Sequence, residues 1–570
     1  MMPARQANPG SGPAARPVPP LPHRVAPASW PRVAAALASL LVLNALLSFG
    51  PWWPTPGVVL QARLAPEMVA MWLGLLALAA RRTSPSPRLT WLLAAGVLVL
   101  VLGRYADITA PSLFGRPISL YWDVPQVPRF LWVTARGEPW WASMLAVAAV
   151  LALGWALLAL IRVCLELVLR HLAPRALRSV WAWVAAFAAA LLAAAHMAGV
   201  PGTGPYATHA VLPTYVQQLR LLWDAHWPGR LAYALPSLTP VEDAMALHGP
   251  HALAALRQRD VSFIFLESFG AVLYDHPRIR PATEAGRVAV QQALAASGRQ
   301  VVSGFFRSPV IGGASDLAHL SLLSGVNLSD PRRHDLLLTT GRPTLMHLFR
   351  QAGYQAFGLY HAVSWPWPEH VHYGFDHLVD GPALGYTGPP ITFWKVPDQI
   401  ALARFDALHP RTADSPPRVL FFPTITSHFP FNPVPPYQPD WTRAAGADPF
   451  DAEAVRAALA QPLDWLDMGA HYVGTVNYVY RWLAGHFRRP EPRETVYVLI
   501  GDHQPTANIT GEGVPWDVPV HIVSRDPALL ERFRALGFTN GLWPDRTVLG
   551  ELNHLNSLLL TAFGPAAPAP

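Results

Sequence analysis

Residues 261–270 read Val-Ser-Phe-Ile-Phe-Leu-Glu-Ser-Phe-Gly, a mostly apolar run that ends abruptly at a carboxylate. Further short apolar runs occur along the chain, at 356–360, 418–424, 495–500 and 518–523. Helical stretches separate them, and apolar runs of this length that alternate with helices are typical of buried parallel strands. The C-terminal part of the chain is therefore predicted to be an α/β domain with a mainly parallel central sheet.

Polar side chains follow three of these runs, at the point where each predicted strand ends. Glu267 follows the first run, Ser427 and His428 follow the run at 418–424, and Asp502 and His503 follow the run at 495–500. Ligands of open α/β sheets bind at the carboxyl ends of the strands. We therefore expect the three clusters to meet in one crevice.

A glycine-rich turn adds a hydroxyl to this set. Gly312-Gly313-Ala314-Ser315-Asp316 precedes an apolar helical run, so Ser315 is expected in the first helical turn, where the amide groups favour an anion. Carboxylate, imidazole and hydroxyl groups suit a divalent ion such as Zn or Mn, which helps a hydroxyl lose its proton and become a nucleophile. Singly, each group has a simpler reading as a helix cap, a turn or a solvated charge. Their coincidence predicts a metal site.

The composition excludes a protein that is soluble throughout. Hydrophobic residues make up 52% of the 570 residues and charged residues only 14%. The single cysteine, Cys164, excludes an intramolecular disulfide and a cysteine-based zinc site. The net charge of +7 comes from basic residues spread between apolar segments, so nucleic-acid binding is not expected.

The N-terminal part carries apolar segments close to the roughly 20 residues that span a bilayer. Five transmembrane helices are predicted, at 33–49, 65–80, 89–103, 142–162 and 180–200. Arginines cluster before the first helix, at 81–88 and at 162–178, which are alternate loops, so these regions are expected in the cytoplasm. Five crossings then put the rest of the chain outside. The outer loop 104–141 mixes charged and aromatic residues, a set that suits the level of the lipid headgroups and contact with either a lipid or the soluble domain.

Four regions follow from these patterns. Residues 1–32 are predicted to be a disordered cytoplasmic tail and 33–200 a five-helix transmembrane domain. Residues 201–255 are predicted to be a linker with connecting helices, and 256–562 an extracytoplasmic catalytic domain.

The motifs together resemble a known family. Leu-Glu-Ser-Phe at 266–269, the turn before Ser315, Ser-His-Phe-Pro-Phe at 427–431 and Gly-Asp-His at 501–503 are similar to the alkaline phosphatase superfamily. Within it they most resemble the membrane-anchored, sulfatase-like group of lipoteichoic acid synthases and phosphoglycerol or phosphoethanolamine transferases. This resemblance implies an alkaline-phosphatase-like domain behind a five-helix anchor, in a bacterial inner membrane with the catalytic domain in the periplasm.

The resemblance assigns roles to individual residues. Glu267, Ser315, Asp502 and His503 would hold a divalent metal ion (Mn, Zn or Mg), and Ser315 would also be the covalent nucleophile. Substrate contacts would come from His428, from Trp394 and, with chance placement equally plausible, from Lys395, the chain's single lysine. His521 is a candidate base just outside the metal ligands or a candidate ligand of a second metal, or else a buried structural histidine. His319 is a candidate for reaching the site, or else a helix-surface histidine.

Two departures from the family bear on activity. The transferases usually carry threonine as nucleophile, and an alignment by Ser-Asp would place Ala314 in that position; counting back from Leu322-Leu323-Ser324-Gly325 favours Ser315 instead. Sulfatases need Cys or Ser followed by x-Pro-x-Arg for conversion to formylglycine, whereas Leu317 and His319 stand at the Pro and Arg positions. The match of residues 329–333 to that pattern lies in a polar loop and is read as chance.

The implied function is transfer of a phospho-headgroup from a membrane phospholipid to a glycan or lipid acceptor through a phosphoserine. Two alternatives remain: a sulfatase-like hydrolase of phosphate or sulfate esters on the same fold, and an inactive scaffold that keeps the fold for binding.

Overall fold

The computed structural model describes residues 30–565, except 53–54, 82–85, 129–130, 132–134, 136–138, 227–234, 365, 392–394, 413 and 465–466. The predicted cytoplasmic tail lies outside the described residues up to residue 29. The chain divides into two compact units. The first comprises residues 1–48, 62–99 and 147–209, and the second comprises residues 49–61, 100–146 and 210–570.

The first unit is built from apolar helices. They are α1 (Trp30–Ser48), α2 (Pro66–Ala80), the first part of α3 (Pro87–Phe114), the part of α6 (Trp140–Leu167) from Val147 onward, α7 (Ala173–Ala176) and α8 (Val180–Met197). A π-helical turn, Val168–Leu172, joins α6 to α7. Two short strands, β1 (Gly50–Pro51) and β2 (Val58–Val59), lie between α1 and α2 and belong to the second unit.

The prediction of five membrane-spanning helices is confirmed only in part. Among the described residues, four helical segments are long and apolar enough to cross a bilayer: Trp30–Ser48, Pro87–Phe114, Trp140–Ala176 and Val180–Met197. The remaining predicted segment is α2, which has 15 residues and is therefore about 22 Å long, shorter than the roughly 30 Å hydrocarbon core. The N-terminal part thus contains apolar helices long enough for a membrane anchor.

The second unit contains a nine-stranded mixed sheet with the order β10-β4-β9-β8-β3-β7-β5-β6, and β11 pairs with β4. The bounds are β3 (Asp260–Leu266), β4 (Gln300–Arg307), β5 (Gln355–Tyr360), β6 (His377–Asp380), β7 (Arg418–Pro423), β8 (Thr495–Gly501), β9 (Asp517–Ser524), β10 (Thr539–Asn540) and β11 (Val548–Glu551). The five apolar runs all form strands. The central pairs β8–β3, β3–β7 and β7–β5 are parallel, as predicted.

One of the five runs departs from the parallel expectation. Strand β9 pairs antiparallel with both β8 and β4. Its carboxyl end therefore lies at the opposite edge of the sheet from the ends of β3, β7 and β8. An apolar run does not carry its own direction, because parallel and antiparallel strands bury the same kinds of side chain.

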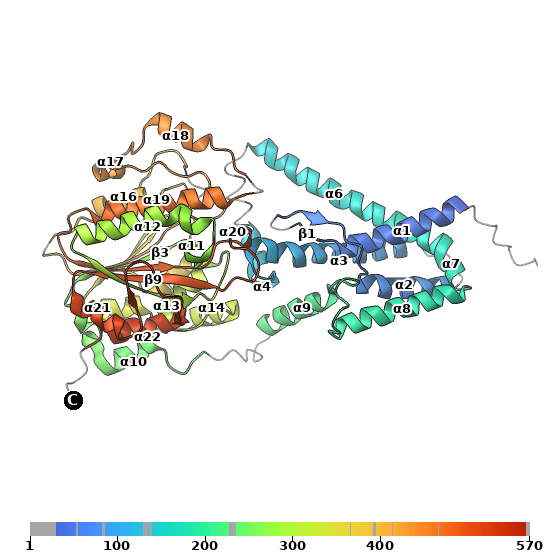
Figure 1. Cartoon of the computed structure of the whole chain (residues 1–570), viewed down its shortest axis with the longest axis horizontal. Helices are drawn as coiled ribbons and strands as arrows, with labels where there is room; N and C mark the ends of the chain where they lie inside the picture. Colours follow the sequence, from blue (N-terminus) through green and yellow to red (C-terminus); the bar gives the residue numbers. More distant parts are fainter. Residues whose placement is uncertain are drawn as a thin grey trace, which may run out of the picture. The chain divides into compact units, whose positions relative to one another are not determined.

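Helices cover both faces of the sheet (Figure 1). One face carries α11 (Val272–Asp275), α12 (Ile279–Ala296), α16 (Asp398–Leu408) and α19 (Gly469–Phe487), and the other α10 (Pro240–His248), α13 (Ser315–Ser324), α15 (Leu345–Gln351), α21 (Pro527–Arg534) and α22 (Leu552–Phe563). Two separate apolar cores lie beneath these layers. The strands are buried on both faces, which explains their continuous apolar runs.

Smaller elements complete the second unit: α4 (Leu120–Asp123), α9 (Leu212–His226), α14 (Pro331–Leu338), α17 (Trp441–Ala445), α18 (Ala452–Leu459) and α20 (Ala507–Thr510). Short 3-10 turns lie at Val124–Gln126, Gly249–His251, Ala254–Leu256 and Pro368–Tyr373.

Candidate active site

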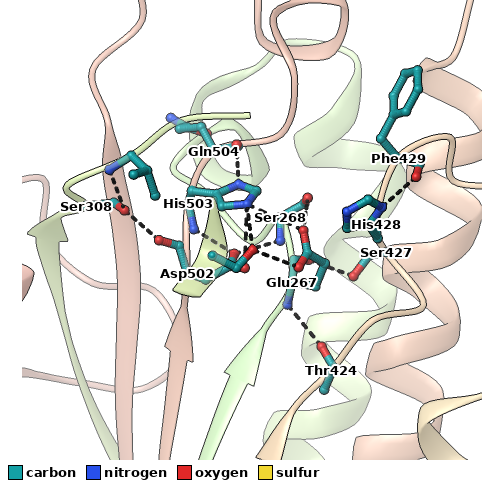
Figure 2. A network of polar contacts seen from close by, with 12 residues as sticks. Glu267, Ser268, Ser308, Thr424, Ser427, His428, Phe429, Asp502, His503 and Gln504 are labelled. Carbon is teal, nitrogen blue, oxygen red and sulfur yellow. Dashed lines mark hydrogen bonds and ion pairs between the residues drawn. The ribbon is translucent and has the colours of Figure 1, made fainter. Parts of the chain in front are cut away.

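Three predicted metal ligands meet at the carboxyl ends of neighbouring parallel strands. Glu267 follows β3, and Asp502 and His503 follow β8 (Figure 2). Each offers one ligand atom, and these atoms lie within 4.8 Å of one another. All three side chains are buried. The paired register of β3 and β8, which ends at Leu266 opposite Gly501, brings the residues together.

Hydrogen bonds hold the Asp502 carboxylate and the Glu267 backbone in place. The Asp502 carboxylate accepts the backbone N–H groups of Ser268 (2.8 Å) and His503 (2.6 Å). The backbone N–H of Glu267 donates to Thr424 Oγ1 (3.0 Å), and the Ser427 hydroxyl donates to the Glu267 carbonyl (2.6 Å). The ends of β3, β7 and β8 are thus tied into one rigid edge.

The His503 ring presents its Nε2 atom to the two carboxylates. Its Nδ1 lies 2.7 Å from the Gln504 carbonyl oxygen, an acceptor that fixes the proton on Nδ1. Nε2 then carries a lone pair, and it lies 3.5 Å from Glu267 Oε1 and 3.6 Å from Asp502 Oδ2. A second hydrogen bond of this kind is what orients histidines that bind metals.

The electrostatics of the cluster suit a bound cation. Burial raises the pKa of the Glu267 carboxyl well above 4.5, and the neighbouring Asp502 charge raises it further. Two buried carboxylates are costly to ionise together unless a positive charge lies between them. The oxygen and nitrogen donors match Mn, Zn or Mg, so the residues fit a divalent ion.

Ser315 joins the cluster. It is the first residue of α13, and its hydroxyl donates to Glu267 Oε2 (3.2 Å) and lies 3.2 Å from His503 Nε2. Ala314, which precedes it, has a left-handed backbone with φ of 62° and offers only a methyl group. Between the two candidates for the nucleophile position, Ser315 is the one with its side chain at the cluster.

Comparison with known proteins agrees with this geometry. Residues 316–515 match the model of the Sulfatase family, a range that includes His428, Asp502 and His503 and starts one residue after Ser315. Over this range the chain therefore contains a sulfatase-family domain, as the motifs predicted. A search of curated proteins finds no match.

Solved structures similar to the sulfatase-family domain share little sequence with it. A protein in the alkaline phosphatase superfamily from Vibrio parahaemolyticus is 17% identical over 47% of this chain and 60% of its own length, with a TM-score of 0.31. The lipoteichoic acid synthase LtaP from Listeria monocytogenes is 13% identical over 50% and 70%, with a TM-score of 0.32. The C-terminal periplasmic domain of EcEptC from Escherichia coli is 13% identical over 50% and 74%, with a TM-score of 0.29.

His428 of the sulfatase-family domain lies beyond β7, beside the cluster (Figure 2). Burial lowers its pKa to about 4, so the ring is neutral at pH 7. Its Nδ1 lies 2.6 Å from the Phe429 carbonyl oxygen, which fixes the proton there and makes Nε2 an acceptor. An acceptor at this place suits a hydroxyl or an ammonium group of a substrate.

His521, in strand β9, occupies a different environment. Its Nδ1 lies 2.6 Å from Ser303 Oγ, and its Nε2 lies 3.3 Å from Tyr274 OH. Both ring nitrogens therefore have partners outside the cluster of predicted metal ligands. Burial lowers its pKa to about 3. These contacts fit the alternative of a buried structural histidine, because β9 runs antiparallel and its carboxyl end does not lie at the site.

His319 is not on the helix surface, so that alternative is wrong. The residue is 4% exposed, and its ring packs edge-on against Phe265 at a centroid distance of 4.5 Å. Its Nδ1 lies 3.9 Å from Asp316 Oδ1, and within the described residues neither ring nitrogen has a hydrogen-bond partner. The ring faces the sheet, and it makes no hydrogen bond to Ser315.

The two other predicted substrate residues are not brought to the site by any described contact. Trp394 lies outside the described residues. Lys395 is exposed and has a left-handed backbone with φ of 83°. Their substrate roles stay predictions.

Sequence reasoning missed one buried histidine at the same edge of the sheet. His361 follows β5, and its Nε2 lies 3.0 Å from Asp398 Oδ1, with both side chains fully buried. Asp398 Oδ1 also accepts the backbone N–H of Ile425 (2.8 Å). The rule that selected Glu267 and His503 would have selected His361, because it directly follows the apolar run at 356–360.

Proposed function

We propose that this protein is a metal-dependent, membrane-bound phosphotransferase. It moves a phospho-headgroup, phosphoglycerol or phosphoethanolamine, from a phospholipid to an extracytoplasmic glycan or lipid acceptor. The observation that carries this proposal is the Ser315 hydroxyl, which lies 3.2 Å from both Glu267 Oε2 and His503 Nε2 at the start of α13. A hydroxyl between two buried metal ligands suits covalent catalysis.

Glu267, Asp502, His503 and Ser315 are the residues that would hold the metal ion. When bound, a divalent ion lowers the pKa of a coordinated hydroxyl and neutralises negative charge on a phosphoryl group. The raised pKa of Glu267 supports this assignment, because a cation is what allows both buried carboxylates to ionise.

The chain's own residues perform two displacements. Ser315 Oγ gives up its proton and attacks phosphorus, and the bond from phosphorus to the diacylglycerol oxygen breaks as that oxygen takes up a proton. The headgroup phosphate is then an ester of Ser315. In the second step the acceptor hydroxyl loses its proton and attacks phosphorus, and Ser315 leaves and regains a proton. The N-terminal amides of α13 favour the phosphate's charge in both steps.

His428 is proposed to select the headgroup. Its neutral ring has the proton on Nδ1, held by the Phe429 carbonyl, so Nε2 accepts a hydrogen bond. Glycerol hydroxyls and the ethanolamine ammonium both supply the matching donor. Trp394 and Lys395 remain proposed contacts of the headgroup.

The sulfatase-family match also supports a second candidate, a hydrolase of phosphate or sulfate esters. A formylglycine-dependent sulfatase is disfavoured because Leu317 and His319 replace the Pro and Arg that the conversion needs. A phosphatase that transfers the phosphoryl group from the Ser315 ester to water, and so regenerates the Ser315 hydroxyl, would keep the roles of Ser315 and the metal-binding residues.

A five-helix anchor is proposed in spite of the short α2, and contacts at its N-terminal end support it. Leu64, just before α2, pairs with Ala207, which follows α8. In the second unit, Arg104 Nε of α3 donates to the Phe49 carbonyl (3.0 Å), and Phe49 follows α1. The segments between α1 and α2, after α3, and after α8 would therefore share one side of the membrane.

The opposite end of α2 supports the same topology. Leu76 packs against Ala173 and Ala176 of α7, the connection between α6 and α8. A helix that begins beside the end of α8 and ends beside its start spans the same thickness as α8. Extended flanking residues rise more per residue than helix and would cover the missing length. With five crossings, the arginine-rich loops place the catalytic domain outside the cytoplasm.

Mass spectrometry of the Ser315 peptide tests the proposal. Purified protein is incubated with total membrane lipid and a divalent metal, and the peptide is examined for added mass. Phosphoglycerol or phosphoethanolamine on Ser315 is expected, and its mass names the headgroup. A bare phosphate on Ser315 would favour the phosphatase. Two negative results together would favour the inactive scaffold. They are the absence of an adduct on Ser315 with metal and lipid present, and an unchanged phenotype of cells that carry Ser315→Ala in place of the wild type.

A further inference from the structure

Helix α9 (Leu212–His226) carries a stripe of exposed apolar side chains. The stripe consists of Leu212 (57% exposed), Val216 (40%), Leu219 (61%) and Trp223 (53%). Their spacing of four, three and four residues places all four side chains on one side of the helix. Gln217 and Arg220 are exposed beside the stripe, so the helix has separate apolar and polar exposed sides.

A third side of α9 is attached to the catalytic unit. Gln218 is buried, and its side chain accepts the backbone N–H of Leu120 (2.9 Å) and donates to the Ile118 carbonyl (3.1 Å). Tyr121 of α4 packs edge-on against His226, and its hydroxyl donates to the Asp335 carboxylate of α14. These contacts attach α9 to the catalytic unit and so fix the position of the apolar stripe on it.

The position of α9 in the chain connects it to the membrane. It begins 15 residues after α8 ends at Met197, and α8 is apolar enough to span a bilayer. Tyr215 of α9 packs so closely on Gly103 of the long apolar helix α3 that a Cβ at Gly103 would lie 2.5 Å from the tyrosine ring. Both residues belong to the second unit. The helix that carries the stripe therefore packs on a helix that is long and apolar enough to span a bilayer.

We infer that α9 is an interfacial helix whose stripe inserts into the outer surface of the phospholipid bilayer. An amphipathic helix of this kind lies in the membrane plane with its apolar side among the acyl chains and its polar side in water. Arg220 stands at the border of the stripe, where a guanidinium meets anionic headgroups. Through α4 and α14, α9 would hold the catalytic unit at the level of the headgroups. The inference is independent of the reaction proposed above.

Spin labels on two cysteines of α9 test this inference. In the full chain with Cys164→Ala, Leu219→Cys and, as the matched control two residues away, Gln217→Cys are labelled and the protein is placed in phosphatidylglycerol–phosphatidylethanolamine vesicles. Collision rates with oxygen, which concentrates in the bilayer, and with a water-soluble nickel chelate are measured. The ratio of oxygen to nickel collisions is expected to be several-fold higher at 219 than at 217.

Two results would overturn the inference. Equal access of the nickel chelate to both labels would place the stripe in water. A label at 219 that neither reagent reaches would mean that protein covers the stripe, for example a second copy of the chain. Neither result depends on turnover, so loss of the proposed reaction and loss of the interfacial helix are separate outcomes.

Discussion

At the scale of single residues, the proposed chemistry depends on the Ser315 hydroxyl and on the neighbouring Glu267 carboxylate. Ser315 Oγ has two buried neighbours, Glu267 Oε2 and His503 Nε2, each 3.2 Å away. The preceding residue, Ala314, has a left-handed backbone conformation that L-residues rarely adopt. Such conformations cluster at active sites, where they help to position a neighbouring side chain. This geometry makes the serine and the carboxylate separately testable.

Ser315→Ala is expected to lower turnover of the lipid donor roughly a thousandfold or more, because the covalent step has no nucleophile. Donor consumption and the peptide adduct are both measured. Ser324→Ala, at the end of the same helix, is the control, because its hydroxyl donates to the Leu320 carbonyl and accepts the Val326 N–H, both away from the cluster. Equal activity of wild type and Ser315→Ala would contradict the assigned role.

Glu267 is expected to make the metal-free protein less stable as the pH rises. Its folded pKa lies above 4.5, so the unfolded chain releases this proton first, and folding is progressively penalised from about pH 4.5 upward. A metal at 100 times its Kd would restore about 2.7 kcal/mol. The melting temperature is measured with Mn and with chelator at pH 5.5 and at pH 8. The difference between the Mn and chelator samples should therefore be larger at pH 8 than at pH 5.5.

Glu267→Gln should remove most of that pH dependence from the metal-free protein. Asp316→Asn is the control, because the Asp316 carboxylate is 58% exposed and stands at the same helix start. If Glu267→Gln kept the full dependence, the buried carboxylate would not be its source.

At the scale of elements, the active-site edge requires the backbone just after β3 to approach the end of β8 closely. Gly501 ends β8, and a Cβ at this position would lie 1.9 Å from the Phe269 carbonyl oxygen. This contact explains the glycine before Asp502 and His503. Gly501→Ala is expected to destabilise the domain by about 3 kcal/mol and to weaken metal binding, because backbone must move. Gly341→Ala, where a Cβ meets nothing within 4 Å, is the control in denaturant unfolding.

The antiparallel strand β9 gives a second expectation at this scale. His521 is neutral in its buried contact with Ser303 and Tyr274, with a pKa of about 3. A base with a lowered folded pKa loses stability as the pH falls below its unfolded value of about 6.5, by about 2 kcal/mol between pH 7 and pH 5. His521→Phe should reduce this loss in unfolding measurements while leaving metal affinity unchanged. A loss of metal affinity would instead tie His521 to the site.

At the scale of the whole molecule, the side of the membrane that the catalytic domain occupies depends on whether the short α2 crosses. In a Cys164→Ala chain, Val58→Cys precedes α2 and Ser86→Cys follows it. If α2 crosses, a membrane-impermeant maleimide added to intact cells is expected to label the first and not the second. Labelling of both would place them on one side, leave four crossings, and reverse the proposed orientation of every later segment.

The sequence by itself determined the apolar helices, the strands and the residues at their ends. These depend on local composition: an apolar run of 20 residues or of six behaves in the same way wherever it lies, and Glu267, Asp502 and His503 directly follow such runs. The sulfatase-family domain was recognisable for the same reason, from motifs that are contiguous in the chain.

Only the tertiary structure decided direction, depth and neighbourhood. Strand β9 runs antiparallel, so His521 lies with Ser303 and Tyr274; His319 packs on Phe265 under its helix; and His361 pairs with Asp398 across 37 residues. The tertiary structure also decides which side of α9 is exposed, because Gln218 is buried against Leu120 and the apolar stripe lies on another side of the helix. Such features depend on which surfaces distant segments cover, and a local pattern contains no information about its distant partners.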